Sequence, residues 1–333
     1  MEMRSSIGAL FLLGVVIFVS GVPDDQEPDR FIPADSTLSG PLISSQTGME
    51  TAWDLPKNPF IDSLPQDKHL AEQIVLGYRI FSNTPKEAPR YTGNKLSCNN
   101  CHLNAGQREK AMPLVGVSGV FPEYNKRAGR LFTLEDRIVG CFLRSEHAVR
   151  PRTPGKSATA LFRGDESIVP TTAHEVLALA AYISWLSSGY EIGTKPPWRG
   201  QNVIPSDKIV PVSKLDPKLG KALYVEKCVT CHGEDGQGVQ IGDKKAGPLW
   251  GHNSWNDGAG AARVYTLAGM ILYMMPYLNP ESLTYEEAQH IAAFINSKPR
   301  PAFPYKGRDY TTEPLPPDAL YYKSRSGKTT SKK

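Results

Sequence analysis

The sequence of 333 residues has almost no long apolar runs and little net charge of either sign. Apart from residues 7–22, no stretch approaches the roughly 20 apolar residues of a membrane helix. Lys and Arg outnumber Asp and Glu by only four, an excess too small to indicate a nucleic-acid partner. There are five cysteines, and no second ligand pair with zinc-finger spacing follows the first Cys-x-x-Cys run. These absences argue against a nucleic-acid-binding protein, a zinc finger and a multispan membrane protein.

The N-terminus has the pattern of a signal peptide. Arg4 precedes the apolar run, and small residues separate that run from an acidic polar segment. We therefore expect residues 1–22 to direct export to a bacterial periplasm, with an uncleaved N-terminal anchor as the alternative and no membrane span after cleavage. Residues 23–59 are rich in Pro, Asp, Ser and Gly and lack sustained periodicity, which indicates an extended arm.

Four of the five cysteines belong to two Cys-x-x-Cys-His motifs. In an exported chain this motif indicates covalent attachment of a c-type haem, because the two thiols bond to the porphyrin and the adjacent imidazole ligates the iron. The sequence therefore predicts two covalently bound haem c groups. The first is expected on Cys98, Cys101 and His102, and the second on Cys228, Cys231 and His232.

The chain repeats itself around these motifs. A helical pattern precedes each motif, a Pro-Leu loop follows it, and a second helical pattern ends each half. The order resembles class I cytochrome c, whose first and last helices cross through small residues. We therefore expect a mainly α protein with two class I cytochrome c-like domains. The expected crossings are Gly77 with Ala181 and Tyr182, and Gly220 with Ala293 and Phe294.

The repeat also suggests the domain organisation. We expect residues 60–190 to form the first domain, around the catalytic haem, and residues 215–301 to form the second, around an electron-transfer haem. Residues 191–214, rich in Pro, Gly and polar side chains, are expected to be a linker that wraps around the molecule. Residues 302–333 are expected to form a Pro-containing tail with a basic end.

The second iron needs a sixth ligand unless it binds substrate directly. Met275 precedes a proline and lies shortly before the last helix, where class I cytochromes place their methionine ligand. We expect it to ligate the second iron, with Met274 as the alternative. Met270 and Met274 also fit core positions on a helix, and His252 fits a loop position with a hydrogen bond near the haem.

The first iron has a different set of candidates. Met112 precedes Pro113 and looks like a ligand, but Pro113 matches Pro248 in the repeat. Such a proline lies on the proximal side, with its carbonyl accepting the Nδ1 proton of the haem histidine, so Met112 is a poor sixth ligand. The remaining candidates are Cys141, His147 and His174, of which His174 begins a helix and is expected to be exposed.

Cys141 is the one cysteine of the sequence outside the two haem motifs. It lies in an expected helix that starts at Thr133, on a face shared with Arg137, Arg144 and Ser145. A nearby ferric iron and guanidinium groups favour the thiolate form of a cysteine. The alternative is a small buried side chain of the core.

Basic residues concentrate around this expected helix. Between His102 and Arg163 there are eleven Lys and Arg residues and five Asp and Glu residues. We therefore expect an anionic substrate at the first haem, because guanidinium groups bind oxyanions with a fork of donors. Some of the arginines must instead pair with haem propionates or with neighbouring carboxylates. The candidates are Arg127, Arg130, Arg137, Arg144 and Arg152.

The segments LSCNNCHLNAG, PLVGV, RAGR and LEDRIVGCFLRS together resemble the catalytic domain of the tetrathionate-forming thiosulfate dehydrogenases, dihaem c-type enzymes of the bacterial periplasm. The resemblance covers roughly residues 70–301 and is most specific at residues 137–145. It implies ligation of the first iron by His102 and Cys141, a substrate pocket lined by Arg127, Arg137 and Ser145, and ligation of the second iron by His232 and Met275. Some relatives have a lysine beside that methionine, where this chain has Met274.

The resemblance implies an enzyme that joins two thiosulfate ions into tetrathionate, and the haem potentials decide whether the reaction also runs in reverse. Cys141 would leave the iron and bond to the first sulfane sulfur, and the electrons would pass from the first haem to the second. The expected acceptor is a small soluble cytochrome c or a similar protein. Two alternatives remain: a sulfur-oxidation cytochrome that loads thiosulfate onto a carrier protein, and a plain dihaem electron carrier, which needs neither Cys141 nor the arginine cluster.

Overall fold

The computed structural model of the protein describes residues 57–148, 168–241 and 244–322. The expected signal peptide, nearly all of the expected N-terminal arm, Arg152 and the basic end of the tail lie outside these ranges. Within them, no helix combines the length and apolar character that a membrane crossing requires.

The first half is built on the crossing of α1 (Lys68–Ser82) with α5 (His174–Leu186). A Cβ atom at Gly77 would overlap with the carbonyl oxygen of Ala178 and lie 2.7 Å from Cβ of Tyr182. Only glycine allows this approach of the two backbones. The expected contact with Tyr182 is therefore confirmed, and the nearest backbone contact is Ala178 rather than Ala181, because the crossing lies one turn nearer the start of α5.

The second half repeats this crossing with α6 (Pro217–Lys227) and α9 (Tyr285–Asn296). A Cβ atom at Gly220 would overlap with the carbonyl oxygen of His290 and lie 2.9 Å from Cβ of Phe294. The contact with Phe294 is confirmed, and His290 occupies the place of Ala178. A third helix, α8 (Val264–Met274), packs against α9.

Shorter elements complete the two halves. The helices α2 (Thr84–Glu87), α3 (Leu103–Gly106) and α4 (Leu134–Arg144) belong to the first half, as does the antiparallel hairpin of β1 (Glu123–Asn125) and β2 (Arg130–Phe132). The second half adds α7 (Val229–His232) and the antiparallel pair β3 (Gln240–Ile241) and β4 (Lys244–Lys245). The 3-10 turns are η1 (Pro89–Tyr91), η2 (Cys98–Asn100), η3 (Val117–Val120), η6 (Ser206–Lys208), η7 (Val212–Lys214), η8 (Gly260–Ala262) and η9 (Lys306–Arg308).

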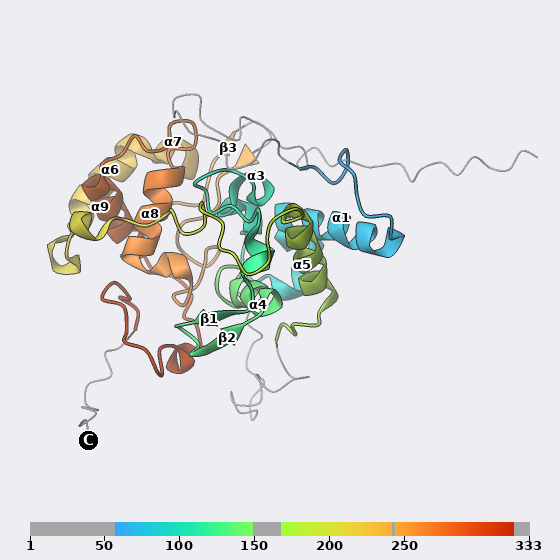
Figure 1. Cartoon of the computed structure of the whole chain (residues 1–333). Coiled ribbons are helices and arrows are strands. Elements are labelled where there is room, and N and C mark those ends of the chain that lie inside the picture. The colour runs from blue at the N-terminus through green and yellow to red at the C-terminus, as the bar shows by residue number, and fades with distance from the viewer. Residues whose placement is uncertain (1–56, 149–167, 242–243, 323–333) are drawn as a thin grey trace, which may run out of the picture.

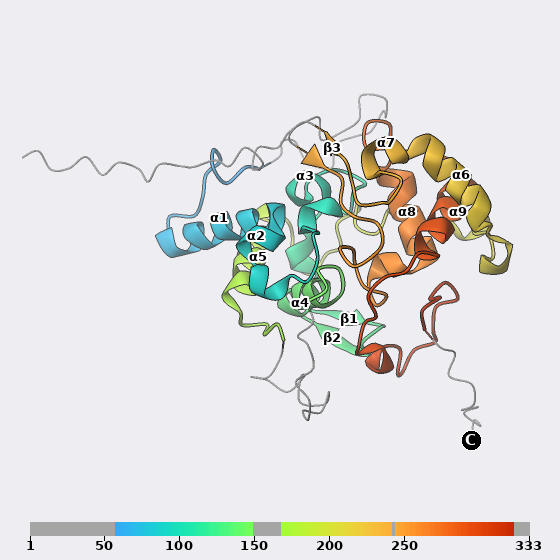
Figure 2. The ribbon, with the colours of Figure 1, turned by 180° about the vertical axis from the view of Figure 1, so that it is seen from behind.

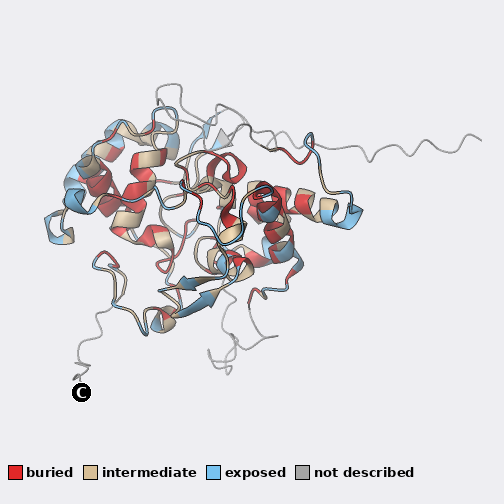
Figure 3. Ribbon diagram, in the orientation of Figure 1, coloured by how far each residue is buried: buried red, intermediate tan, exposed pale blue. Residues whose placement is uncertain are grey.

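The two halves lie side by side. Figure 1 shows α1, α4 and α5 on one side and α6, α8 and α9 on the other, and the view from behind in Figure 2 shows the same division. Buried residues concentrate along the facing sides of the long helices of each half (Figure 3). Each half has its own hydrophobic core. The expectation of a mainly α protein with two repeated helical units is thus met.

Two segments outside the helical units cross between the halves. In the expected linker, the indole nitrogen of Trp198 donates to the Val115 carbonyl at 2.9 Å. After the last helix, the backbone N–H of Tyr310 donates to the Arg127 carbonyl at 2.7 Å, and Asp309 accepts two hydrogen bonds from Arg144 at 2.7 and 2.8 Å. The C-terminal segment therefore returns to the first half.

Candidate active site

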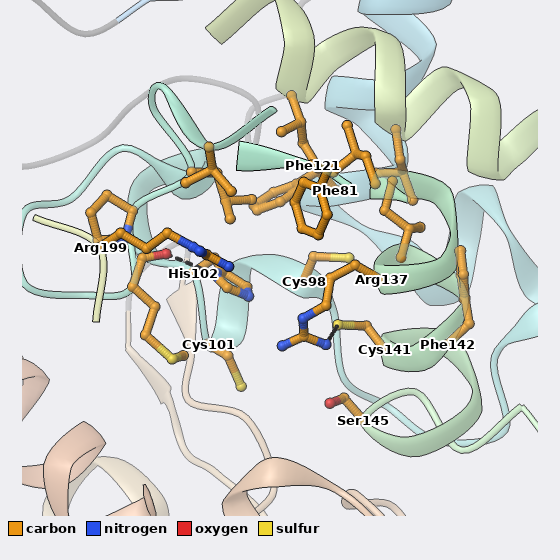
Figure 4. A pocket seen from close by; sticks show the side chains of 18 of the residues that line it. Phe81, Cys98, Cys101, His102, Phe121, Arg137, Cys141, Phe142, Ser145 and Arg199 are labelled. Carbon is orange, nitrogen blue, oxygen red and sulfur yellow. Dashed lines mark hydrogen bonds between the residues drawn. The ribbon is translucent and has the colours of Figure 1, made fainter. Parts of the chain in front are cut away.

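The first Cys-x-x-Cys-His motif lines a cavity of about 400 Å³. Ser97 and Asn100 form a reciprocal capping box around η2, which fixes the start of the turn that carries the motif. As a result Cys98, Cys101 and His102 all face one space, as Figure 4 shows. Two thiols and an imidazole on one cavity form the donor set that covalent haem attachment requires, so these residues fit a haem.

His102 is oriented through its backbone partner. Its Nδ1 lies 2.7 Å from the carbonyl oxygen of Met112, which leaves Nε2 for a metal. Burial lowers the pKa of His102 to about 4, and the imidazole is therefore neutral at pH 7, the form that ligates iron. We expected the Pro113 carbonyl to accept this hydrogen bond, and that prediction is wrong by one residue. The acceptor is the carbonyl of Met112, in the peptide bond that precedes Pro113.

The opposite wall of the cavity belongs to α4. Thr133 and Asp136 form a capping box at its start, which confirms the expected helix start. Residues at a spacing of four fall on one face of a helix. Arg137, Cys141 and Ser145 line the cavity, together with the buried side chains of Leu134, Ile138 and Phe142, which also pack on the core of the first half.

Arg137 and Cys141 interact directly on this face. Nη1 of Arg137 donates to Sγ of Cys141 at 3.4 Å, and Figure 4 shows both side chains across the cavity from His102. Ser145 follows one turn later and points toward the same space. The structure thus brings the cysteine outside the motifs, an arginine and a serine to the side of the cavity opposite the motif histidine.

The cavity opens into a larger cleft of about 1250 Å³, which Cys101, His102, Arg137, Cys141 and Ser145 also line. Seven basic and four acidic residues line the cleft, which favours anionic substrates. The basic residues are Lys126, Arg127, Arg130, Arg137, Arg144, Arg263 and Arg308, and the acidic ones are Glu123, Asp136, Asp309 and Glu313.

Several of these arginines have partners in the protein. Arg130 donates to both carboxylate oxygens of Asp136, at 2.7 and 2.9 Å, as the expectation of pairing with neighbouring carboxylates required. Arg144 is bound by Asp309 and stacks on the ring of Phe303. These two arginines hold the walls of the cleft, which leaves fewer guanidinium groups for substrate.

Neither of the other expected ligand candidates of the first iron lines the cavity. His147 is buried with its Nδ1 3.3 Å from Nδ2 of Asn256, and burial lowers its pKa. His174 is exposed at the start of α5, as expected. His252 is also exposed and packs edge-on against His147, away from both cavities that hold the motif histidines.

Some residues of the site were not expected from the sequence. Glu146 lines the first cavity, is 2% exposed, and has a pKa well above its usual value because of burial. The one sequence feature that could have indicated this role of Glu146 is its position directly after Ser145. Lys195 and Arg199 of the expected linker also line the cavity, and Arg199 pairs with Glu123. A Pro- and Gly-rich segment gives no periodicity from which such a role could be inferred.

The second motif faces a more apolar cavity. Cys228 and His232 line it together with Met274 and Met275 at the end of α8, and the remaining lining is mainly aliphatic. Burial lowers the pKa of His232. The indole nitrogen of Trp255, also on this cavity, is buried without a hydrogen-bond partner among the described residues. An unpaired donor beside Cys228 and His232 suits the propionate of a haem.

Each half of the chain matches a known protein family. The family described as SoxA/TsdA, cytochrome c domain, matches residues 89–192, and the family described as cytochrome C oxidase, cbb3-type, subunit III, matches residues 216–295. A thiosulfate dehydrogenase of Allochromatium vinosum is 37% identical over 72% of this chain and 83% of its own length. This chain belongs to the thiosulfate dehydrogenase family. It is therefore an oxidoreductase with two class I-like cytochrome c domains, and these carry two covalently bound haem c groups.

Other thiosulfate dehydrogenases agree. The protein of Stutzerimonas stutzeri is 35% identical over 72% of this chain and 73% of its own length, and that of Psychrobacter arcticus is 34% identical over 89% and 85%. A solved structure, the thiosulfate dehydrogenase TsdBA of Marichromatium purpuratum in its as isolated form, is 34% identical with a TM-score of 0.61. That match covers 73% of this chain and 49% of the solved chain, so this chain spans about half of its length.

Proposed function

We propose that the chain oxidises two thiosulfate ions to tetrathionate in the periplasm and passes the electrons to a small soluble cytochrome c or a similar acceptor. The observation that carries this proposal is Cys141, which shares a cavity with His102 and opens into a basic cleft. The similar proteins named thiosulfate dehydrogenase support thiosulfate as the substrate. The signal-peptide pattern of residues 1–22 supports export.

The proposed iron ligands follow from the two cavities. His102 and Cys141 would ligate the first iron, and His232 and Met275 the second, with Met274 as the alternative. A thiolate and a thioether are both soft ligands that suit haem iron. When bound, the two haems supply two one-electron acceptors, which matches the two electrons released for each tetrathionate.

Cys141 has a second proposed role as nucleophile. Its thiolate bonds to the sulfane sulfur of the first thiosulfate as two electrons leave, which gives a protein-bound S–S–SO₃⁻ group. The second thiosulfate attacks the same sulfane sulfur. The bond to Sγ of Cys141 then breaks, tetrathionate departs, and the thiolate is restored. The same steps in reverse reduce tetrathionate.

Cations are needed because the two thiosulfates repel each other. At an effective dielectric of 20, even two unit charges ~4 Å apart cost about 4 kcal/mol. Arg137 beside Sγ offsets this repulsion at the reacting sulfur. Arg127, which lines the same cleft, and the hydroxyl of Ser145 are proposed to hold sulfonate oxygens.

Electron transfer between the two haems is supported by the contact of the two motif loops. Cys101 and Asn100 of the first motif line the cavity of the second motif together with Cys228. A Cβ atom at Gly247 would lie 2.8 Å from Leu96 and 3.0 Å from Asn100, so the two halves touch beside both attachment sites.

The proposal is tested by adding thiosulfate and an acceptor to the oxidised holoprotein while haem absorbance and tetrathionate are followed together. Haem reduction with one tetrathionate per two electrons supports it. Reduction that needs a carrier protein and yields no free tetrathionate would favour the carrier-loading alternative. The absence of any thiosulfate-dependent reduction would leave only an electron carrier.

A further inference from the structure

The cleft beside Cys141 has a second wall, which comes from the second half of the chain. Arg263, Thr266 and Met270 line this wall. Arg263 is the N-cap residue of α8, and Thr266 and Met270, four residues apart, share one face of the helix that follows it. The cleft therefore lies between α4, which carries the cysteine, and a helix of the other domain.

A loop before α8 fixes this wall to α4. Asn256 is fully buried, and its backbone N–H donates to the Arg144 carbonyl at 3.1 Å. Its Nδ2 donates to the Leu143 carbonyl at 2.9 Å. Two residues later in the same loop, the Gly258 carbonyl accepts hydrogen bonds from Nη1 of Arg127 at 2.8 Å and from Nη1 of Arg144 at 2.9 Å. The loop thus joins the end of α4 to the segment that carries Arg263.

In the part of the chain that the structure describes, Arg263 has no hydrogen-bond partner for its side chain, unlike the arginines of α4 and of the β1–β2 hairpin. Arg130 and Arg144 are bound by carboxylates, and Arg127 donates to a carbonyl. Within the described residues, the side chain of Arg263 makes no hydrogen bond or ion pair, and its Nε is buried without a partner. Burying part of a guanidinium without a partner is costly, so this position favours a bound anion. Arg263 does not line the cavity of the second motif.

We propose that Arg263 binds the sulfonate of the second thiosulfate, the ion that attacks the adduct on Cys141. The inference rests on the proposed function and assigns the second substrate ion to a subsite supplied by the electron-transfer domain. The first thiosulfate is held on the α4 side, with Arg137 beside its reacting sulfur and with Arg127 and Ser145 at its sulfonate oxygens. The second enters against α8, where the forked donors of Arg263 match two sulfonate oxygens. The two sulfane sulfurs then meet between the walls.

The test compares Arg263→Gln and Arg263→Lys with the full holoprotein. Lys218→Gln is the matched control, because it removes one charge from an exposed position of α6 outside the cleft. Each protein is exposed to thiosulfate with ferricyanide as acceptor. Three quantities are measured: the tetrathionate rate against thiosulfate concentration, the mass of the Cys141 adduct, and the midpoint potentials of both haems.

We expect Arg263→Gln to raise the thiosulfate concentration for half-maximal rate by about tenfold to a hundredfold, the loss of a charge-assisted contact. The adduct should form but accumulate, because only the second ion has lost its subsite. For Arg263→Lys the thiosulfate concentration for half-maximal rate should lie between those of the unaltered protein and Arg263→Gln, since lysine keeps the charge and loses the paired donors of the guanidinium group. The control and both haem potentials should remain as in the unaltered protein.

Two results would overturn the subsite. A shifted haem potential without adduct accumulation would mean that Arg263 binds a haem propionate. Unchanged kinetics in Arg263→Gln, in a protein whose unaltered form makes tetrathionate, would remove the subsite alone. If the unaltered protein makes no tetrathionate, the proposed function and the subsite fall together.

Discussion

The two halves share one frame and differ in what faces the motif histidine. In both, a glycine of the first helix sits against a backbone carbonyl of the last helix, Gly77 on Ala178 and Gly220 on His290. In the first half the wall opposite His102 carries Cys141 with an arginine, beside a wide basic cleft. In the second half the space near His232 is lined by methionines and aliphatic side chains.

Under the proposed function, this difference lets one scaffold serve two tasks. The helix crossing fixes the position of the motif loop, and the loops after it are free to change. A polar wall with a thiol admits an anion, whereas a closed apolar wall excludes it and leaves only electron exchange. The repeated part of the sequence therefore accounts for haem binding, and the proposed substrate site lies in the part that is not repeated.

The largest effect on this contrast should come from Cys141→Gly. We expect tetrathionate formation to fall at least about a thousandfold, since the nucleophile is removed. Both haems should remain attached, because Cys98, Cys101, Cys228 and Cys231 are untouched. Rates and haem content measured together test this, and full activity in the variant would remove Cys141 from the mechanism.

The next effect should come from the second half. Met275→Leu should lower the potential of the second haem, because a thioether ligand raises it. A shift of about 60 mV changes a one-electron equilibrium about tenfold, so turnover should slow while adduct formation on Cys141 persists. Met274→Leu is the matched comparison. A spectrum that changes in that variant instead would assign the ligand to Met274.

A smaller effect on turnover should follow from loosening the join between the halves. Asn256→Ala leaves the Leu143 carbonyl without its donor, which costs about 1–3 kcal/mol of stability. The end of α4 should shift, altering the absorbance of the first haem and not of the second. Asn253→Ala serves as control, because within the described ranges the side chain of Asn253 hydrogen-bonds only to Gln237. Equal changes at both haems would contradict the assigned role.

The two helix crossings can be weakened without changing any residue proposed to act on substrate. Gly77→Ala and Gly220→Ala should each destabilise by about 1–3 kcal/mol through overpacking against a backbone carbonyl. Gly140→Ala, on α4 with open space around the new methyl group, should instead stabilise by up to about 1 kcal/mol. Thermal unfolding measures all three. A loss of stability in only one half would show that the two crossings are not equivalent.

The parts of the molecule that local patterns govern were predictable from the sequence. The motif loops, the start of α4 at Thr133 and the helix crossings each depend on residues close together or repeated along the chain. The structure was needed to show that Cys141, and neither His147 nor His174, lines the cavity, because helical spacing alone does not show which side chain reaches it.

The second wall of the cleft could not be predicted. The pair Arg144–Asp309 joins residues 165 positions apart, and Arg127 binds a backbone carbonyl, which any residue could provide. Neither contact produces a periodic pattern in the sequence. The one-residue error at Pro113 has a similar cause, since sequence does not show which of two neighbouring carbonyls turns toward the imidazole ring.

The return of the C-terminal segment onto the first half has a consequence for biosynthesis. Asp309 holds Arg144, and Tyr310 holds the backbone of Arg127, so both bonds can form only once synthesis has reached the last tenth of the chain. The first half therefore depends on the C-terminal segment for two of the contacts that hold Arg144 and Arg127. Gene fission between the two cytochrome units would give a first fragment that binds its cofactor and lacks a finished substrate chamber.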